Sequence, residues 1–547
     1  MFVLLCAWLH LAVIVNGQAI TTNIDDSLLL VVGDVTSSTA RILFDQVPGS
    51  AFKIDVRVHE TMARTREALA GATPNQTLEI RVQSYNGRPQ VLELRDLEPE
   101  RRYVVQLEVD DPRETATVMF HTARVKRENE DEGEWTDRVL VVSCDRYVDD
   151  HDDVMMEKLA RDVEAHDDAL RSSSVHFGMA HLGDQIYSDA GNSKIEVVPF
   201  PLKSMADRKT RRTRYEAVLE QFRGIYRKTF SRKAAQRVFR IGAHWMLPDD
   251  HEIINNFNFE LVQKAFYTKE GSELSETDRE KLVALQLHCR AGLQAYYEFQ
   301  YQLYRDFPWH NVDFLEDALD EILRTHPVYF AVELERVKLM FLDVRFERSF
   351  FDSSNVDDLP KLVGDDQRSF LDGKLKAWSA EDRSTAVVFS SMPLFFQSAF
   401  TALIAYIVEH ETYPGMAEQR GGLEDLFGLF VGYNDPRQGA SELNMTPLIR
   451  LLVGGDLHMM AHSRVCGTKV TNPVCLDQLI TSGITNGSTS IQDTKLVPYY
   501  YLITQLTPVF EIVYSWAQYI PLLSSLLPSS SPWHIEHDRV FFGRNYG

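Results

Sequence analysis

The chain has 547 residues, of which 44% are hydrophobic and 25% are charged, and these fractions are typical of globular proteins. Its length exceeds what one hydrophobic core usually organises, which predicts two domains with appended segments. The net charge of -22 argues against a nucleic-acid-binding surface as the main function, because phosphate backbones are bound by an excess of lysine and arginine. An acidic balance suits a protein that binds divalent or trivalent cations.

Residues 1–19, MFVLLCAWLHLAVIVNGQA, are predicted to be a signal peptide. Their apolar core is too short for a membrane span and ends in small residues, with Val15 and Gly17 placed like a signal-peptidase site. The alternative is a buried first strand. Three sequons agree with export and are candidate glycosylation sites; they begin at Asn75, Asn444 and Asn486. We therefore expect a secreted or extracellular protein.

The chain has five cysteines, too few for disulfides to be the main scaffold of a secreted protein of this length. Cys466 and Cys475 lie on either side of a turn and are predicted to form a hairpin disulfide. Cys289 lies in a helical stretch and is expected to be a buried apolar residue. Cys144 remains, at the end of an apolar run, and a spare thiol there needs an explanation.

Residues 20–123 alternate apolar and polar side chains in short runs that are separated by turn residues such as Asn86-Gly87. This pattern predicts a small all-β sandwich of fibronectin or immunoglobulin type, without an obvious catalytic cluster. Residues 124–137 are rich in glutamate and lack apolar periodicity, so they are expected to be an acidic linker. A second domain over residues 138–547 then begins with the buried strand RVLVV.

Two early strands of this second domain end in residues that bind hard metals. The first strand ends at Cys144. The second, HFGMAHL, turns at Gly183 and presents Asp184 and Tyr187, in a loop that an α/β protein places at the carboxyl edge of its sheet. The acidic run after Cys144, DRYVDDHDD, favours a solvated loop leading into a helix, and a metal site is the alternative.

A basic, helical stretch follows over residues 203–240. The favoured interpretation is a pair of amphipathic helices with solvated lysines and arginines, and the alternative is a surface that steers an anionic substrate.

The third junction, LPDDHEIINN, places Asp249, Asp250, His251 and Glu252 directly after a short apolar strand and Pro248. Two adjacent carboxylates beside an imidazole are costly near a sheet edge unless a cation neutralises them. An aspartate-capped helix start with a satisfied histidine is the alternative, and it accounts for one aspartate only.

Two later strands end in further polar groups. The strand VKLMFLDVRFERS offers Asp343, Arg345 and Arg348; an arginine there can bind phosphate, or form a salt bridge to Asp343. The strand IRLLVGGDLH ends in Asp456 and His458, which lie on the same side of an extended loop and suit the chelation of one ion.

The ordered set strand-SC, strand-GDxIY, DDHE, LDxRxxR, SSxP and strand-GDxH resembles the PhoD-like alkaline phosphatase/phosphodiesterase family of the calcineurin-like metallophosphoesterase superfamily. The resemblance extends from about residue 137 to the end, and a β-sandwich in front is usual in that family. It implies an α/β fold, a four-layer α/β/β/α sandwich preceded by the small all-β sandwich, with a mixed Fe(3+) and Ca(2+) centre.

The resemblance also implies a role for each matching residue. Cys144, Asp184 and Tyr187 would bind iron, and Asp184 would bridge to a second metal. The remaining ligands implied by position are Asp250, Asn255, Asp456 and His458. The choice among Asp249, Asp250, Asn255 and Asn256 stays open, because Pro248 replaces an aromatic residue of the family pattern. His251 would be the general acid and Arg345 the phosphate clamp, with Arg348 beside it.

These groups predict a secreted metal-dependent phosphatase or phosphodiesterase that acts on small phosphate esters or phosphodiesters through an activated water, without a serine or cysteine nucleophile. The alternatives are a non-catalytic binding protein with the same fold, and a purple acid phosphatase, whose GNH(D/E) and GHxH motifs are missing here.

Residues 394–408 and 497–527 are long apolar stretches. Buried core helices are the favoured interpretation. A surface that lies on lipid is the alternative, with peripheral membrane contact and phospholipids as substrates of a phospholipase D-like phosphodiesterase.

Overall fold

The computed structural model describes residues 28–46, 52–60, 73–82, 87–109, 115–125, 137–147, 153–170, 176–191, 194–257, 275–348, 361–381, 384–396, 420–434, 448–458, 460–468, 474–481 and 533–541, with single positions 402, 414, 483 and 516. The predicted signal peptide and the sequons at Asn444 and Asn486 lie outside these residues. So does the apolar stretch 497–527, apart from Trp516, whose side chain is 75% exposed.

The N-terminal region is all-β, as the alternating pattern predicted. One sheet has the strand order β1-β2-β5 and the other the order β4-β3-β6-β7. Buried and half-buried residues alternate along β7, as in a sandwich with one face on the core. The strands are β1 (Leu28–Val35), β2 (Ala40–Gln46), β3 (Phe52–Glu60), β4 (Gln76–Val82), β5 (Gln90–Leu94), β6 (Arg102–Val109) and β7 (Thr115–His121).

The second region contains two sheets. The first has the order β10-β9-β8 and is parallel throughout. Its strands β9 and β10 are buried along their whole length, because a parallel sheet is covered on both faces. These strands and the helices between them are β8 (Arg138–Val142), α2 (Val154–Leu170), β9 (Phe177–Leu182), α3 (Leu202–Met205), α4 (Arg208–Phe230), α5 (Lys233–Phe239) and β10 (Ala243–Leu247).

The second sheet has the order β11-β12-β13-β14-β16-β15-β17. Strands β12, β13, β14 and β16 are parallel neighbours, and β11, β15 and β17 pair antiparallel. Its strands are β11 (Phe330–Glu333), β12 (Val337–Leu342), β13 (Thr385–Ser390), β14 (Ile449–Gly454), β15 (Met460–Gly467), β16 (Cys475–Ile480) and β17 (Trp533–Phe541). Cys466 and Cys475 face each other across β15 and β16 and are joined by a disulfide, with 4.2 Å between their Cα atoms.

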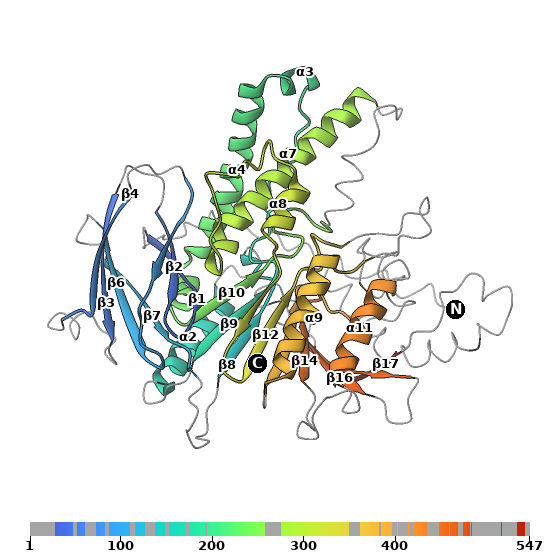
Figure 1. Ribbon diagram of the computed structural model, residues 1–547. Coiled ribbons are helices and arrows are strands. Elements are labelled where there is room, and N and C mark those ends of the chain that lie inside the picture. The colour runs from blue at the N-terminus through green and yellow to red at the C-terminus, as the bar shows by residue number, and fades with distance from the viewer. Residues whose placement is uncertain are drawn as a thin grey trace, which may run out of the picture.

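Helices cover the outer faces of the two sheets, in agreement with the expected α/β/β/α order. Helices α9 and α11 lie over the second sheet and share a separate apolar core with it, whereas α2, α4, α5 and α7 pack into the large core that includes the first sheet (Figure 1). The remaining elements are α7 (Glu276–Phe299), η3 (Tyr301–Leu303), α8 (Leu319–Thr325), α9 (Asp365–Ser379) and α11 (Arg420–Asn434).

No helix in the described part of the chain is both long and apolar enough to cross a membrane.

The basic stretch predicted over residues 203–240 forms α3, α4 and α5, and many of its cations pair with carboxylates of the same chain. The Nε of Arg227 lies 2.8 Å from Asp45 of the sandwich, and Arg237 binds Glu164 at 2.7 Å. Gln236 adds a hydrogen bond from the Leu30 N–H at 3.0 Å. The stretch therefore joins the two regions, and the steering-surface alternative gains no support from these paired cations.

Candidate metal centre

The ends of β8 and β9 lie side by side because their loops are hydrogen-bonded to each other. The Cys144 N–H donates to the Gly183 carbonyl at 3.1 Å, and the Asp145 N–H to the Asp184 carbonyl at 2.8 Å. Cys144 and Asp184 both have left-handed backbone conformations, with φ of 57° and 56°. Two neighbouring strands thus turn sharply at the residues that the sequence marked as ligands.

Gly183 allows the loop after β10 to approach the loops after β8 and β9. Its φ is +88°, which disfavours any side chain, and an added Cβ would lie 2.4 Å from the Cβ of Asp249. A glycine is therefore required for the second and third predicted junctions to meet.

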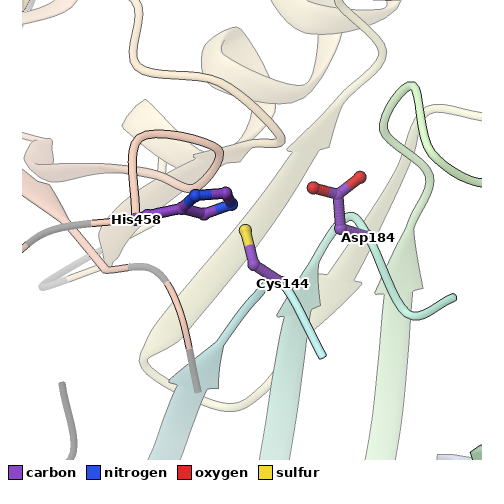
Figure 2. Close-up of side chains that lie close together, drawn as sticks. All are labelled: Cys144, Asp184 and His458. Carbon is purple, nitrogen blue, oxygen red and sulfur yellow. The ribbon is translucent and has the colours of Figure 1, made fainter. Parts of the chain in front are cut away.

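Cys144, Asp184 and His458 form the first group of metal-ligating side chains. One ligand atom from each lies within 4.8 Å of the others, although His458 comes from the loop after β14 in the second sheet. Figure 2 shows the Cys144 sulfur directed into the space between the His458 ring and the Asp184 carboxylate. The Tyr187 hydroxyl donates to Asp184 at 3.0 Å and lies 3.2 Å from His458 Nε2. Four of the predicted ligands therefore meet at one place.

The anionic forms of these buried groups are costly without a cation. Burial raises the pKa of Asp184 well above its ordinary value, and burial raises the pKa of the Cys144 thiol to about 12. A metal ion reverses this cost, because it stabilises carboxylate and thiolate directly.

Asp249, Asp250 and Asp456 form the second group, with one oxygen of each within 4.8 Å of the others. Arg345 is fully buried among them: its Nε donates to Asp249, and its Nη2 lies 3.6 Å from Asp250 and 3.4 Å from Asp456. The Ser391 hydroxyl donates to Asp249 at 3.0 Å. One guanidinium therefore faces three carboxylates, which leaves an excess of negative charge.

His251 joins the two groups, since it lies with Asp184 and Asp250 in a third set of clustered ligand atoms. Its ring packs against Tyr187, with 4.2 Å between ring centroids, and its Nδ1 lies 2.6 Å from Asp189. Burial lowers the pKa of His251, but the carboxylates of Asp250, Asp184 and Asp189 outweigh it and raise the pKa to about 10. The sequence analysis did not single out Asp189. Its position in the loop after β9, seven residues beyond Leu182, could have marked it as a residue near the metal ligands.

Glu252 is a second residue to which the sequence analysis assigned no role. Its carboxylate is buried and accepts the backbone N–H groups of Asp184 at 3.1 Å, Gln185 at 2.7 Å and Asp249 at 2.8 Å. Gln300 donates a fourth hydrogen bond at 3.0 Å. Burial raises the pKa of Glu252 to about 7. This one side chain fixes the loops after β9 and β10 relative to each other.

The structure places three further predicted residues as follows. The Asn255 side chain is exposed, and its backbone N–H donates to Asp189 at 2.6 Å. Arg348 is buried, with its Nη1 3.4 Å from the Met392 sulfur. Asn75 is exposed at the N-terminal end of β4, on the sandwich. Their roles as ligand, substrate-binding residue and glycosylation site stay predictions.

The donor set fits the implied cations. Within the part of the chain that the structure describes, Asp249 Oδ2 and Asp250 Oδ1 are buried and accept no hydrogen bond. A buried carboxylate oxygen without a hydrogen bond lowers the stability of the fold unless a cation binds it. Thiolate, phenolate and imidazole in the first group suit a transition metal, and the carboxylates of the second group suit a hard cation such as Ca²⁺.

The family model for PhoD-like phosphatases matches residues 139–497. The chain belongs to the PhoD-like phosphatase family. Among solved structures, that of PhoD is similar over 84% of this chain and 77% of its own, with a TM-score of 0.53 and 13% sequence identity. The FN1–FN3 domains of chicken CNTN1 match 17% of this chain and 30% of theirs, with 20% identity and a TM-score of 0.13.

Drosophila Lar FN5 matches 17% of this chain and 89% of its own, with 11% identity and a TM-score of 0.12. No curated protein matches the sequence. The family match covers all three groups of clustered ligands, from Cys144 to His458, and membership in the PhoD-like phosphatase family supports a phosphoesterase function.

Proposed function

We propose that this PhoD-like phosphatase is a secreted, metal-dependent phosphoric ester hydrolase that acts on phosphomonoesters or phosphodiesters. The observation that supports this most strongly is the convergence of Cys144, Asp184 and His458, from both sheets, on one point. Cations bound there would polarise the phosphoryl oxygens and supply an activated water as nucleophile.

Cys144, Asp184, Tyr187 and His458 would hold one cation, proposed to be Fe(3+). Asp250 and Asp456 would hold a second, proposed to be Ca(2+), with Asp184 between the two and Asn255 as a further ligand. Asp249 lies in the same carboxylate group, although Arg345 and Ser391 already donate to one of its oxygens.

His251 is proposed as the general acid that protonates the leaving alkoxide. Its Nδ1 is held by Asp189 at 2.6 Å, so the proton available for transfer is on Nε2. Without bound cations, the carboxylates of Asp250, Asp184 and Asp189 raise the pKa of His251 to about 10, which favours the protonated ring. Cations on Asp250 and Asp184 would oppose this effect, whereas Asp189 would remain as the carboxylate partner of the ring. The side chain is 17% exposed, which leaves it access to a substrate.

Arg345 neutralises part of the carboxylate charge and so keeps Asp249, Asp250 and Asp456 close together. Its full burial among carboxylates differs from an open phosphate-binding position. The clamp role of Arg345 stays a prediction.

The test is hydrolysis of a chromogenic phosphomonoester and a chromogenic phosphodiester by the purified protein, before and after dialysis against a chelator. Metal analysis and a visible spectrum accompany it, because a ferric ion bound to Tyr187 gives a charge-transfer band. We expect chelator-sensitive turnover, and the ratio of the two rates identifies the preferred ester.

Asp184→Asn should lower kcat/KM on the order of 10³-fold, because it removes a ligand charge from the centre. Asp207→Asn is the matched control: Asp207 is exposed and caps α4 through Thr210, and asparagine caps equally well. A colourless, metal-free protein that stays inactive after addition of iron and calcium would refute the proposal and favour the binding-protein alternative.

A further inference from the structure

The three carboxylates around Arg345 raise the question of which cationic side chain meets a phosphate ester. Arg345 contacts Asp249, Asp250 and Asp456, and its side chain is fully buried, so solvent does not reach its guanidinium. An anionic substrate gains most from a guanidinium at the accessible side of the centre.

Arg146 is such a group. It lies two residues after Cys144, in the turn where Cys144 has a φ of 57°, and its backbone N–H donates to the Cys144 carbonyl at 3.1 Å. This turn brings its guanidinium carbon to 5.6 Å from the centroid of the Tyr187 ring, and the Arg146 side chain is half-buried. The Tyr187 hydroxyl in turn contacts Asp184 and His458, so Arg146 lies one side chain away from the first ligand group.

Two neighbouring cations contact groups other than the proposed metal ligands. Arg232 binds Asp145, and its Nη1 lies 2.8 Å from Asp153, so two carboxylates balance its charge. Lys228 is exposed and lies over the Tyr147 ring, with Nζ 5.2 Å from its centroid. Arg146 is therefore the arginine of this loop that lies against a proposed metal ligand.

We propose that Arg146 is a substrate-binding residue that holds non-bridging phosphoryl oxygens of the ester, and of inorganic phosphate as product. This inference rests on the proposed hydrolase function and names the group that receives the substrate's charge. The planar guanidinium can donate two parallel hydrogen bonds to a phosphoryl group, which the lysine ammonium cannot.

The experiment uses the full-length, metal-loaded protein and the variants Arg146→Met and Arg146→Lys. Turnover of the two chromogenic esters is measured together with inorganic phosphate binding by titration calorimetry. We expect Arg146→Met to weaken phosphate binding about tenfold or more and to lower kcat/KM on the order of 10²-fold, with Arg146→Lys between it and the unmodified protein. Metal content and melting temperature should be unchanged, which excludes misfolding or loss of the cluster as the cause.

Lys209→Met is the matched control. Lys209 is an exposed residue in the first turn of α4, and its replacement removes the same unit of charge. If Lys209→Met weakens phosphate binding as much as Arg146→Met does, the effect is one of overall charge and the inference is wrong. Phosphate binding by Arg146→Met within about twofold of the unmodified protein also overturns it.

Phosphate binding measured by calorimetry tests this inference separately from the proposed hydrolase function. If the unmodified protein hydrolyses neither ester yet binds phosphate in a manner that depends on Arg146, the hydrolase proposal fails and Arg146 remains an anion-binding residue. If it hydrolyses esters and Arg146→Met does so equally well, the hydrolase proposal stands and the role of Arg146 is refuted. Absence of phosphate binding in the unmodified protein refutes the inference.

Discussion

The two sheets of the second region bring different charges to their shared edge. The strand ends of the first sheet supply the Cys144 thiol, the carboxylates of Asp184, Asp249 and Asp250, and the His251 imidazole, so carboxylates outnumber cations there. The second sheet supplies the fully buried cation Arg345 after β12, besides Asp456 and His458 after β14. In either sheet alone, these buried charged groups would lack partners of opposite charge, so the candidate centre depends on the docking of one sheet on the other. Arg345→Met, Glu252→Gln and a fall in pH should each disturb a different part of this arrangement.

Arg345→Met removes the cation that the second sheet inserts among the carboxylates. We expect the free energy of unfolding of the metal-free protein to fall by about 3–5 kcal/mol, because the buried carboxylates lose their counter-ion. Chemical denaturation measures it. Addition of metal ions should recover part of the loss, since cations neutralise the same carboxylates.

Arg324→Met serves as the control for Arg345→Met. Arg324 lies in α8 and pairs with Glu321, and both side chains are more than half exposed, at 62% and 60%. An exposed pair contributes little, so this variant should lose much less stability. Equal losses in the two variants would contradict the role given to Arg345.

Glu252→Gln disturbs the first sheet alone. Glutamine has one side-chain oxygen, whereas the two Glu252 oxygens accept three backbone N–H groups and one from Gln300. At least one backbone N–H then loses its acceptor, at a cost of about 1–3 kcal/mol. The displaced loops should lower kcat about 10- to 100-fold, because groups that orient metal ligands have effects of this size.

The control for Glu252→Gln is Glu216→Gln, which makes the same chemical change at an exposed position of α4. Stability and turnover should match the unmodified protein. Retention of full kcat and metal content by Glu252→Gln would show that the loops do not need this carboxylate.

Acid should weaken the first sheet through its buried histidines. Burial lowers the pKa of His176, next to β9, and of His244 in β10, from 6.5 to about 4. A depressed folded-state pKa gives stability that is present above pH 6.5 and is lost as the pH falls through about 4. Each histidine should contribute a slope of about 1.4 kcal/mol per pH unit in this window.

His176→Phe isolates one of these slopes, because it keeps a ring beside Trp245 and cannot be protonated. The pH dependence of its unfolding free energy should be shallower than that of the unmodified protein between pH 6.5 and 4. His310→Phe replaces an exposed histidine and should leave the slope unchanged. Identical slopes for all three proteins would contradict the assignment.

Much of the fold followed from local pattern. Alternation predicted the N-terminal sandwich, and the buried runs that end in Cys144, Gly183 and Gly454 predicted strands whose carboxyl ends face one edge. Because each ligand directly follows a strand, its sequence position already determines on which edge of the sheet it lies. The strand pattern therefore marked Cys144, Asp184 and His458 as strand-end groups, and the resemblance to the PhoD-like family implied that they belong to one metal centre.

Contacts between loops were not predictable in the same way. The Asp189–His251 pair spans 62 positions, and the contact of Arg345 with Asp249 spans 96. No local periodicity encodes which carboxylate such a side chain meets. The sequence analysis therefore gave Arg345 a phosphate-binding role and gave Glu252 none, although the structure buries both as bonding partners within the protein.

By itself, the sequence determined the element order, the two regions and the residue types at each strand end, because these depend on hydrophobic periodicity and on residues adjacent in the chain. Only the tertiary structure decided which of those groups share a site and which are balanced internally. Burial and charge pairing depend on how the two sheets dock, and docking brings together residues that are far apart in the chain.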